Sequence, residues 1–214
     1  MNKIVLAAGL AGLLGFTLPA AQADEVYGQV GTEGVGIGYA RPLGQNFNVR
    51  GEFNGFALSH GFDAGDNHYD AHLKLLHGGL YADVFPMPAL VPFRFTAGVL
   101  IGNDHLDGTT EGSVDINGVV VNTGESVNAK VKLPTVRPYL GIGLGHTPVA
   151  QKGFSVFADL GVAYGRPTVD FDVPANIAAA AGPENVSAEE QQVRDKVDKY
   201  KFYPIVKVGV TYRF

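Results

Sequence analysis

The stretch that decides the fold is the end of the chain, Phe202-Tyr-Pro-Ile-Val-Lys-Val-Gly-Val-Thr-Tyr-Arg-Phe214. Apolar residues occupy every second position from Val206 to Phe214, and polar or small residues stand between them. Successive side chains of a strand point to opposite faces, so this segment can turn one face to lipid and the other to water. The pattern predicts the closing strand of a membrane β-barrel.

The beginning of the chain has a different character. Met-Asn-Lys is followed by an apolar run from Ile4 to Leu18 and by small residues up to Ala23. This order predicts a cleaved secretory signal peptide over 1–23, which leaves 24–214 as one outer-membrane β-barrel domain. No later segment holds about 18 consecutive apolar residues, so we expect no membrane-spanning helix.

The composition limits the chemistry. Glycine makes up 29 of 214 residues, which indicates crowded or sharply curved backbone, and cysteine is absent, which removes disulfides and thiolate chemistry. Acidic residues outnumber basic ones by 21 to 16, so the sequence argues against nucleic acid as a partner.

Period-two alternation and turn residues predict eight strands. Their ranges are 25–31, 34–42, 47–60, 69–85, 93–105, 129–145, 154–167 and 202–214. Short turns alternate with longer connections at about 61–68, 106–128 and 168–201, as periplasmic turns and outer loops do. Because such barrels have an even strand count, we split the first hairpin at Thr32-Glu33-Gly34. The predicted fold class is all-β, an eight-stranded antiparallel transmembrane barrel.

Two of the long connections show further local patterns. Ser187-Ala-Glu-Glu190 is a capping-box sequence with apolar residues following at helical spacing, which predicts a short helix over 187–200 in the last outer loop. That helix is either a lid or receptor-binding element or, as we favour, a solvated helix. Asn117-Gly118 predicts a small hairpin within the earlier connection.

Several residues are expected at the two membrane interfaces. Pro138 and Pro204 cannot donate to a ladder, so we place them near the outer rim, where pairing can lapse. Aromatic residues near the turn-side strand ends suit a girdle at the periplasmic interface. They are Tyr39, Phe47, Phe85, Phe93, Phe154, Tyr212 and Phe214.

If the apolar faces point to lipid, charged residues of both signs collect in the lumen. They are Arg50, Glu52, Asp83, Arg94, Arg137, Asp159, Lys207 and Arg213. We favour a plug of ion pairs that closes the barrel, since eight strands enclose only enough room for side chains. The alternative is a narrow conducting path, because inward glycines at 141, 143, 145, 161 and 165 leave volume for water.

The signal peptide, the eight alternating strands and the terminal Tyr212-Arg213-Phe214 together resemble the small outer-membrane β-barrels of Gram-negative bacteria, in particular the OmpA-type eight-stranded superfamily. The resemblance implies a location in the cell outer membrane. It implies lipopolysaccharide and phospholipid as partners, and the barrel assembly machinery as a transient partner that reads Tyr212 and Phe214. No peptidoglycan-binding domain follows the barrel here, so cell-wall anchoring is not implied.

These features predict a porin-like or structural membrane component; they do not fix the oligomeric state. The alternatives are a surface adhesion or interaction barrel and a lipid-modifying enzyme similar to lipid A deacylases. Such an enzyme needs a serine beside a histidine, but Ser59 and His60 are adjacent and point to opposite faces. His72 and His77 have no serine on the same face of their own strand. We therefore predict no enzymatic activity.

No cofactor and no metal are predicted. Two acidic clusters with histidines lack the spacing of a calcium loop, so we interpret them as solvated loops. They are Asp63, Asp66, His68 and Asp70, and Asp104, His105 and Asp107.

Overall fold

The computed structural model describes residues 23–64, 67–111, 113–122 and 126–214. Within these ranges, the side chains of 62–69, 111–115 and 122 are not described. The predicted signal peptide over 1–23 lies outside the described residues, except for its last residue.

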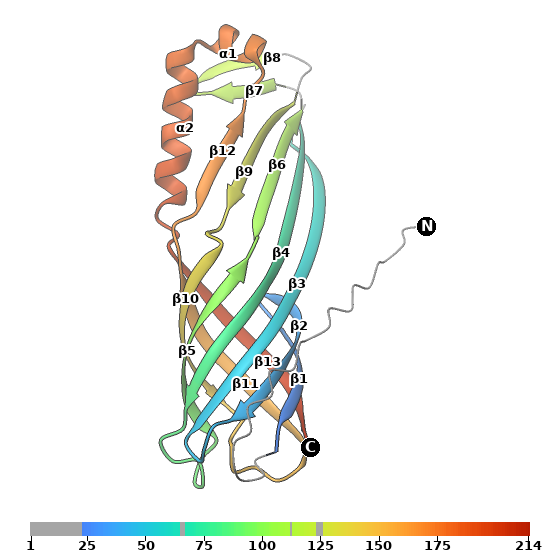
Figure 1. The fold of residues 1–214 in the computed structure, drawn as a ribbon. Helices are drawn as coiled ribbons and strands as arrows, with labels where there is room; N and C mark the ends of the chain where they lie inside the picture. The colour runs from blue at the N-terminus through green and yellow to red at the C-terminus, as the bar shows by residue number, and fades with distance from the viewer. Residues whose placement is uncertain (1–22, 65–66, 112, 123–125) are drawn as a thin grey trace, which may run out of the picture.

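Eight antiparallel strands close into a barrel (Figure 1). They are β1 (Glu25–Gly31), β2 (Gly34–Pro42), β3 (Phe47–Ala64), β4 (Asn67–Val84), β5 (Phe93–Gly102), β10 (Val136–Leu144), β11 (Gly153–Tyr164) and β13 (Phe202–Arg213). The cylinder closes between β1 and β13, where Val26 lies opposite Tyr212. The predicted all-β barrel is confirmed, and so is the first hairpin, in which Gly34 has a φ of 92°.

Beyond one end of the barrel the sheet continues as an outer extension (Figure 1). Its strands are the outer halves of β3 and β4, together with β6 (His105–Glu111), β9 (Val127–Lys132) and β12 (Thr168–Asp172). A hairpin, β7 (Ser113–Ile116) and β8 (Val119–Asn122), and two helices, α1 (Ala175–Ala181) and α2 (Pro183–Val197), complete it. The segments 106–128 and 168–201, predicted as outer loops, therefore hold part of an ordered sheet. The hairpin at Asn117-Gly118 is confirmed.

The predicted helix exists but begins earlier than the sequence indicated. Pro183 occupies its first turn, where a missing N–H costs nothing. Ser187 is therefore an interior residue, and its hydroxyl donates to the carbonyl of Pro183 at 2.9 Å, so the predicted capping box is wrong. Among the described residues, no helix is both long and apolar enough to cross a membrane.

The two strand prolines lie where pairing on one side has ended. β10 pairs with β11 only from Tyr139 onward, one residue after Pro138. β13 pairs with β1 only from Lys207 onward, so Pro204 has a partner only on β11. The predicted placement of both prolines is confirmed, because neither interrupts a ladder on both sides.

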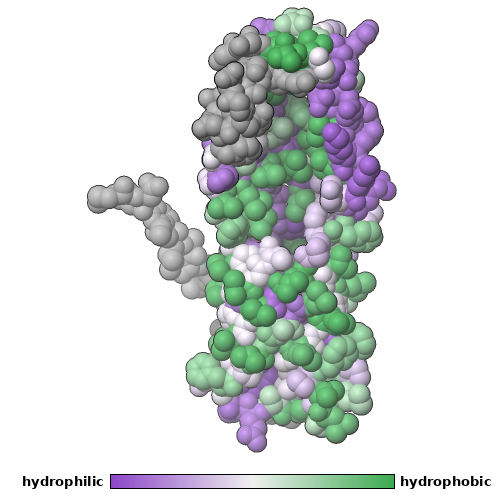
Figure 2. Space-filling model, turned by 180° about the vertical axis from the view of Figure 1, so that it is seen from behind, coloured by the Kyte–Doolittle hydropathy of each residue, from purple (hydrophilic) through white to green (hydrophobic). Residues whose placement is uncertain are grey.

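The outer wall of the barrel is apolar. Leu140 is 65% exposed and Phe154 is 79% exposed, whereas Tyr139, which precedes Leu140, is 2% exposed. Figure 2 shows hydrophobic residues over much of the barrel half of the visible face, and hydrophilic residues gathered on α2. A surface this apolar is not stable in water and fits a lipid environment. Phe85, predicted in the interfacial girdle, is an exception because its side chain is fully buried.

Candidate functional site

The interior of the barrel is filled by polar and charged side chains. All eight residues predicted to line the lumen are there, and none is more than 7% exposed. They alternate along the strands with the apolar residues of the outer wall, as the pleat requires.

Two arginines and two aspartates form the central cluster. Arg50 Nε lies 2.7 Å from Asp83 Oδ2, and Arg50 Nη1 lies 3.3 Å from Asp159 Oδ2. Arg94 Nε lies 3.4 Å from Asp83 Oδ1, and Arg94 also pairs with Asp159. Thr96 donates a further hydrogen bond to Asp83 at 2.7 Å. Each carboxylate therefore lies between two guanidinium groups, which offsets the cost of burying these charges.

A second cluster surrounds Glu52. Lys207 Nζ lies 2.7 Å from Glu52 Oε1 and 3.2 Å from Glu33 Oε2. The hydroxyls of Tyr27 and Tyr81 donate to Glu52 at 3.2 and 2.9 Å. Lys207 also lies 4.7 Å from the centre of the Tyr81 ring, close enough for a cation–π interaction.

Two smaller groups close the ends of the interior. At the turn-side end, Arg213 donates to Glu25 at 3.0 Å, and His146 contacts the same carboxylate. Toward the outer extension, His77 lies 2.8 Å from Glu33 and 2.9 Å from Asp104.

Arg137 pairs with Asp104 at 2.5 Å in this outer group. Ion pairs and hydrogen bonds therefore occupy the lumen from the turn-side end to the outer end.

Side chains from neighbouring strands fill the space above the inward glycines. A Cβ on Gly141 or Gly161 would collide with the Tyr139 ring. Asp159 and Arg94 lie against Gly143, and Phe157 lies against Gly145. The expectation that these glycines leave room for water is wrong, because side chains from neighbouring strands take up that volume.

This packing predicts that replacing two different glycines changes the free energy of unfolding by different amounts. Replacing Gly161 with Ala should lower the free energy of unfolding by about 1–3 kcal/mol, because the Tyr139 ring must move within a packed interior. Replacing outward-facing Gly28 should have little effect, since a Cβ there meets nothing within 4 Å. Urea unfolding of both variants in lipid vesicles measures the difference; equal stabilities would show that the interior is loosely packed.

Five interior acidic residues and histidines were missed by sequence reasoning: Glu25, Glu33, His77, Asp104 and His146. Glu25 could have been found, since it has the parity of Gln29 on the same strand. His146 gave no signal, because it lies in a turn at a φ of 54° and points inward only through that conformation.

One serine and one histidine are within hydrogen-bonding distance, contrary to expectation. Ser59 Oγ lies 2.8 Å from His72 Nδ1 on the exposed face of the outer extension. They are cross-strand partners on β3 and β4, a contact that reasoning within single strands could not find. Asp107, the partner of His72 on β6, lies 2.9 Å from Lys130 instead.

The acidic clusters do not converge on a common point. Asp104 faces the interior, while His105 and Asp107 lie 3.5 Å apart on the outer extension.

Another carboxylate of the outer extension, Asp170, belongs to neither cluster. Lys132 donates to Asp170 at 2.5 Å, and this hydrogen bond holds the pKa of the Asp170 carboxyl below its usual value. Among the described residues, no group of three metal-ligating side chains is found. The side chains of Asp63, Asp66 and His68 lie outside the description.

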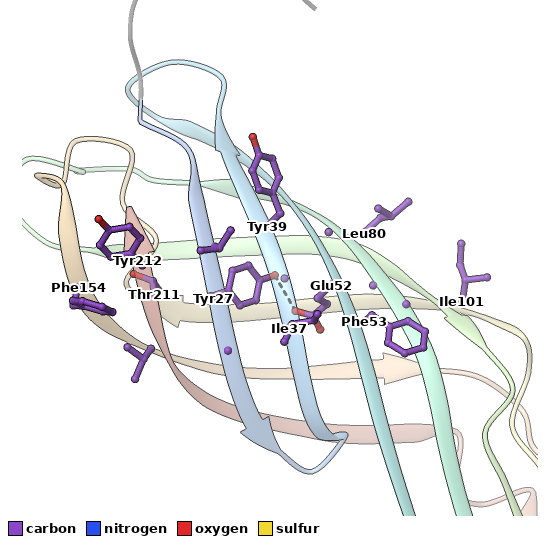
Figure 3. A pocket seen from close by; sticks show the side chains of 17 residues that line it. Tyr27, Ile37, Tyr39, Glu52, Phe53, Leu80, Ile101, Phe154, Thr211 and Tyr212 are labelled. Carbon is purple, nitrogen blue, oxygen red and sulfur yellow. Dashed lines mark hydrogen bonds between the residues drawn. The ribbon is translucent and has the colours of Figure 1, made fainter. Parts of the chain in front are cut away.

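A shallow groove of about 870 Å³ crosses the outer wall over β1 to β4 and is also lined by residues of β5, β11 and β13. It forms where the outward glycines Gly28, Gly51 and Gly78 leave gaps between larger apolar side chains. Figure 3 shows the wall at this place, with Leu80 projecting away from it and the hydrogen bond between Tyr27 and Glu52. Most residues of its lining are apolar residues and glycines of the outer wall, and the interior residues Tyr27, Glu52 and Thr211 also contribute to it.

The fold and the filled, charged interior define an eight-stranded β-barrel of the outer-membrane type. No protein-family model and no curated protein matches the chain. Solved structures do: CarO2 from Acinetobacter baumannii has a TM-score of 0.58 at 22% identity, covering 90% of this chain and 98% of that one. CarO from the same organism has a TM-score of 0.58 at 24% identity, covering 89% and 97%. At these identities the likeness establishes the fold alone.

Proposed function

We infer that this chain is an integral outer-membrane protein whose barrel is closed to solutes and serves as a structural membrane component. The observation that carries this inference is the buried ion-pair network, which occupies the lumen from Glu25 to Arg137. A solute could pass only if paired charges separated in a region of low dielectric, which is costly. The geometry therefore favours a plugged barrel over the porin-like alternative.

Single-channel recording tests this inference. Purified, refolded protein in planar bilayers is expected to show no discrete openings, because the charged side chains fill the lumen. In a matched variant, Arg50, Asp83, Arg94 and Asp159 are all replaced by Ser, which removes two positive and two negative charges together. If it folds, it should conduct small ions through the space it gains. Discrete openings of the unmodified protein would reject the closed barrel and restore the porin-like function.

The surroundings of the barrel follow from the same proposal. The apolar outer wall and its groove would contact phospholipid and lipopolysaccharide. Tyr212 and Phe214, which are 43% and 49% exposed on that wall, would be recognised by the barrel assembly machinery during insertion. Fractionation of cells tests the location: recovery with the outer membrane supports it, and recovery in the soluble fraction contradicts it.

Lipid modification is the second candidate, favoured by the contact between Ser59 and His72. A catalytic histidine needs an orienting group on its second ring nitrogen, and Asp107 is held by Lys130 instead. We therefore propose no enzymatic activity. A fluorophosphonate probe separates the two functions, since labelling that disappears in Ser59→Ala would establish a hydrolase.

A further inference from the structure

A cavity of about 350 Å³ lies between α2 and the inner face of the outer extension. Its floor is a row of small cross-strand partners, in which Ala71 lies opposite Gly108 and Gly108 lies opposite Ala129. Phe171 lies opposite Ala129 and ends the row. Ala71, Gly108 and Ala129 therefore lie side by side, and because all three are small they leave a trough in the sheet.

Helix α2 covers the trough without filling it. Val186 and Val193 line the cavity, yet no residue of α2 is buried. The helix is attached by Val186, which packs against the apolar cluster around Ile116 and Ile177, and by Asn117 at the tip of the hairpin. The Asn117 backbone N–H donates to Glu189 at 3.2 Å, and its side chain bonds Asn185 and Gln192 at 3.0 Å each. These bonds join the helix to the hairpin, beside the sheet of the outer extension (Figure 1), and the cavity is present without a ligand.

The lining is mostly apolar, and its acidic residues are Asp70, Glu189 and Glu190. Val127, Ile116 and Val173 complete the apolar walls. Glu189 and Glu190 line the roof, and Arg194 of the same helix, which is not a lining residue, pairs with Glu190 at 3.1 Å, so the three groups carry a net negative charge. Most small-molecule sites are apolar cavities of roughly 300–1,000 Å³ with a few polar groups that fix orientation. The charge of the roof favours a cation and repels an anion.

We propose that this cavity binds a small organic cation with an apolar body, such as an arylalkyl ammonium ion. The apolar part lies in the trough over Gly108, and the ammonium group faces the carboxylate of Glu189, because Glu190 is paired with Arg194. This site belongs to the outer extension and is independent of whether the lumen conducts.

Phenethylammonium is a suitable probe, with phenylacetate and 2-phenylethanol as the anionic and neutral analogues of similar size. Saturable binding to the full chain in nonionic detergent is measured by isothermal titration calorimetry. We expect phenethylammonium to bind about tenfold more tightly than phenylacetate, the ratio that corresponds to about 1.4 kcal/mol. Equal affinity for phenethylammonium and 2-phenylethanol would overturn the proposal that the site recognises a positive charge.

Three variants locate the site. Gly108→Leu should abolish binding, because its side chain fills the trough, where a Cβ meets only the Ala129 carbonyl at 3.7 Å. Glu189→Gln should remove the preference for the cation, while its amide oxygen can still accept the hydrogen bond from the Asn117 N–H. Glu184→Gln, on the same helix but outside the lining, should bind as the unmodified chain does. Unchanged binding to a folded Gly108→Leu variant would overturn the proposal.

Discussion

Replacing Lys207 with Met is expected to lower the free energy of unfolding by about 3–5 kcal/mol, because it leaves Glu52 buried without its cation. Lys207 is 1% exposed and lies within 3.2 Å of two carboxylates. The tyrosine hydroxyls that also bond Glu52 carry no charge and cannot replace it. Because the chain contains no tryptophan, unfolding in urea is best followed by circular dichroism in lipid vesicles.

The matched control removes both charges. Lys207→Met combined with Glu52→Gln should recover part of the lost stability, because a neutral amide keeps most hydrogen bonds of the carboxylate and needs no counter-ion. Glu33 would retain His77 as its partner at 2.8 Å. If Lys207→Met alone unfolds like the unmodified protein, water must already hydrate these groups, and the lumen is not sealed.

The barrel could be predicted because each of its strands has one face toward lipid and the other toward a polar interior. Lipid outside and paired charges inside force a period of two, and the strand from Phe202 to Arg213 shows that period most clearly. The outer extension has no such constraint. β6, His105–Glu111, lies where neither face meets lipid, so its sequence lacks the alternation that predicts a strand.

The contacts of the lumen could not be predicted from the sequence, although its residues could. Inward direction follows from parity along one strand, which placed Arg50 and Asp159 inside. That these two meet, 109 residues apart, depends on the stagger of strands around the barrel. The contact between Ser59 and His72 could not be predicted for the same reason, because it depends on the register of β3 against β4.

A charge on the outer wall should be costly in proportion to its depth in the membrane. Leu140 lies at the middle of β10 and is 65% exposed, while Val136 begins that strand at its outer end and is 59% exposed. Arginine at the bilayer midplane costs a barrel about 2–4 kcal/mol, and near the interface only about 0–1 kcal/mol. Leu140→Arg should therefore lower the free energy of unfolding in lipid vesicles by the larger amount, and Val136→Arg by the smaller.

The comparison between these two variants isolates the membrane from other causes. Both side chains point outward from the same strand with similar exposure, so β propensity and loss of packing nearly cancel between them. In a protein surrounded by water, either arginine would be solvated and both variants would unfold alike. A difference of several kcal/mol between them can arise only from depth in a hydrocarbon layer, and equal stabilities would contradict the membrane-spanning barrel itself.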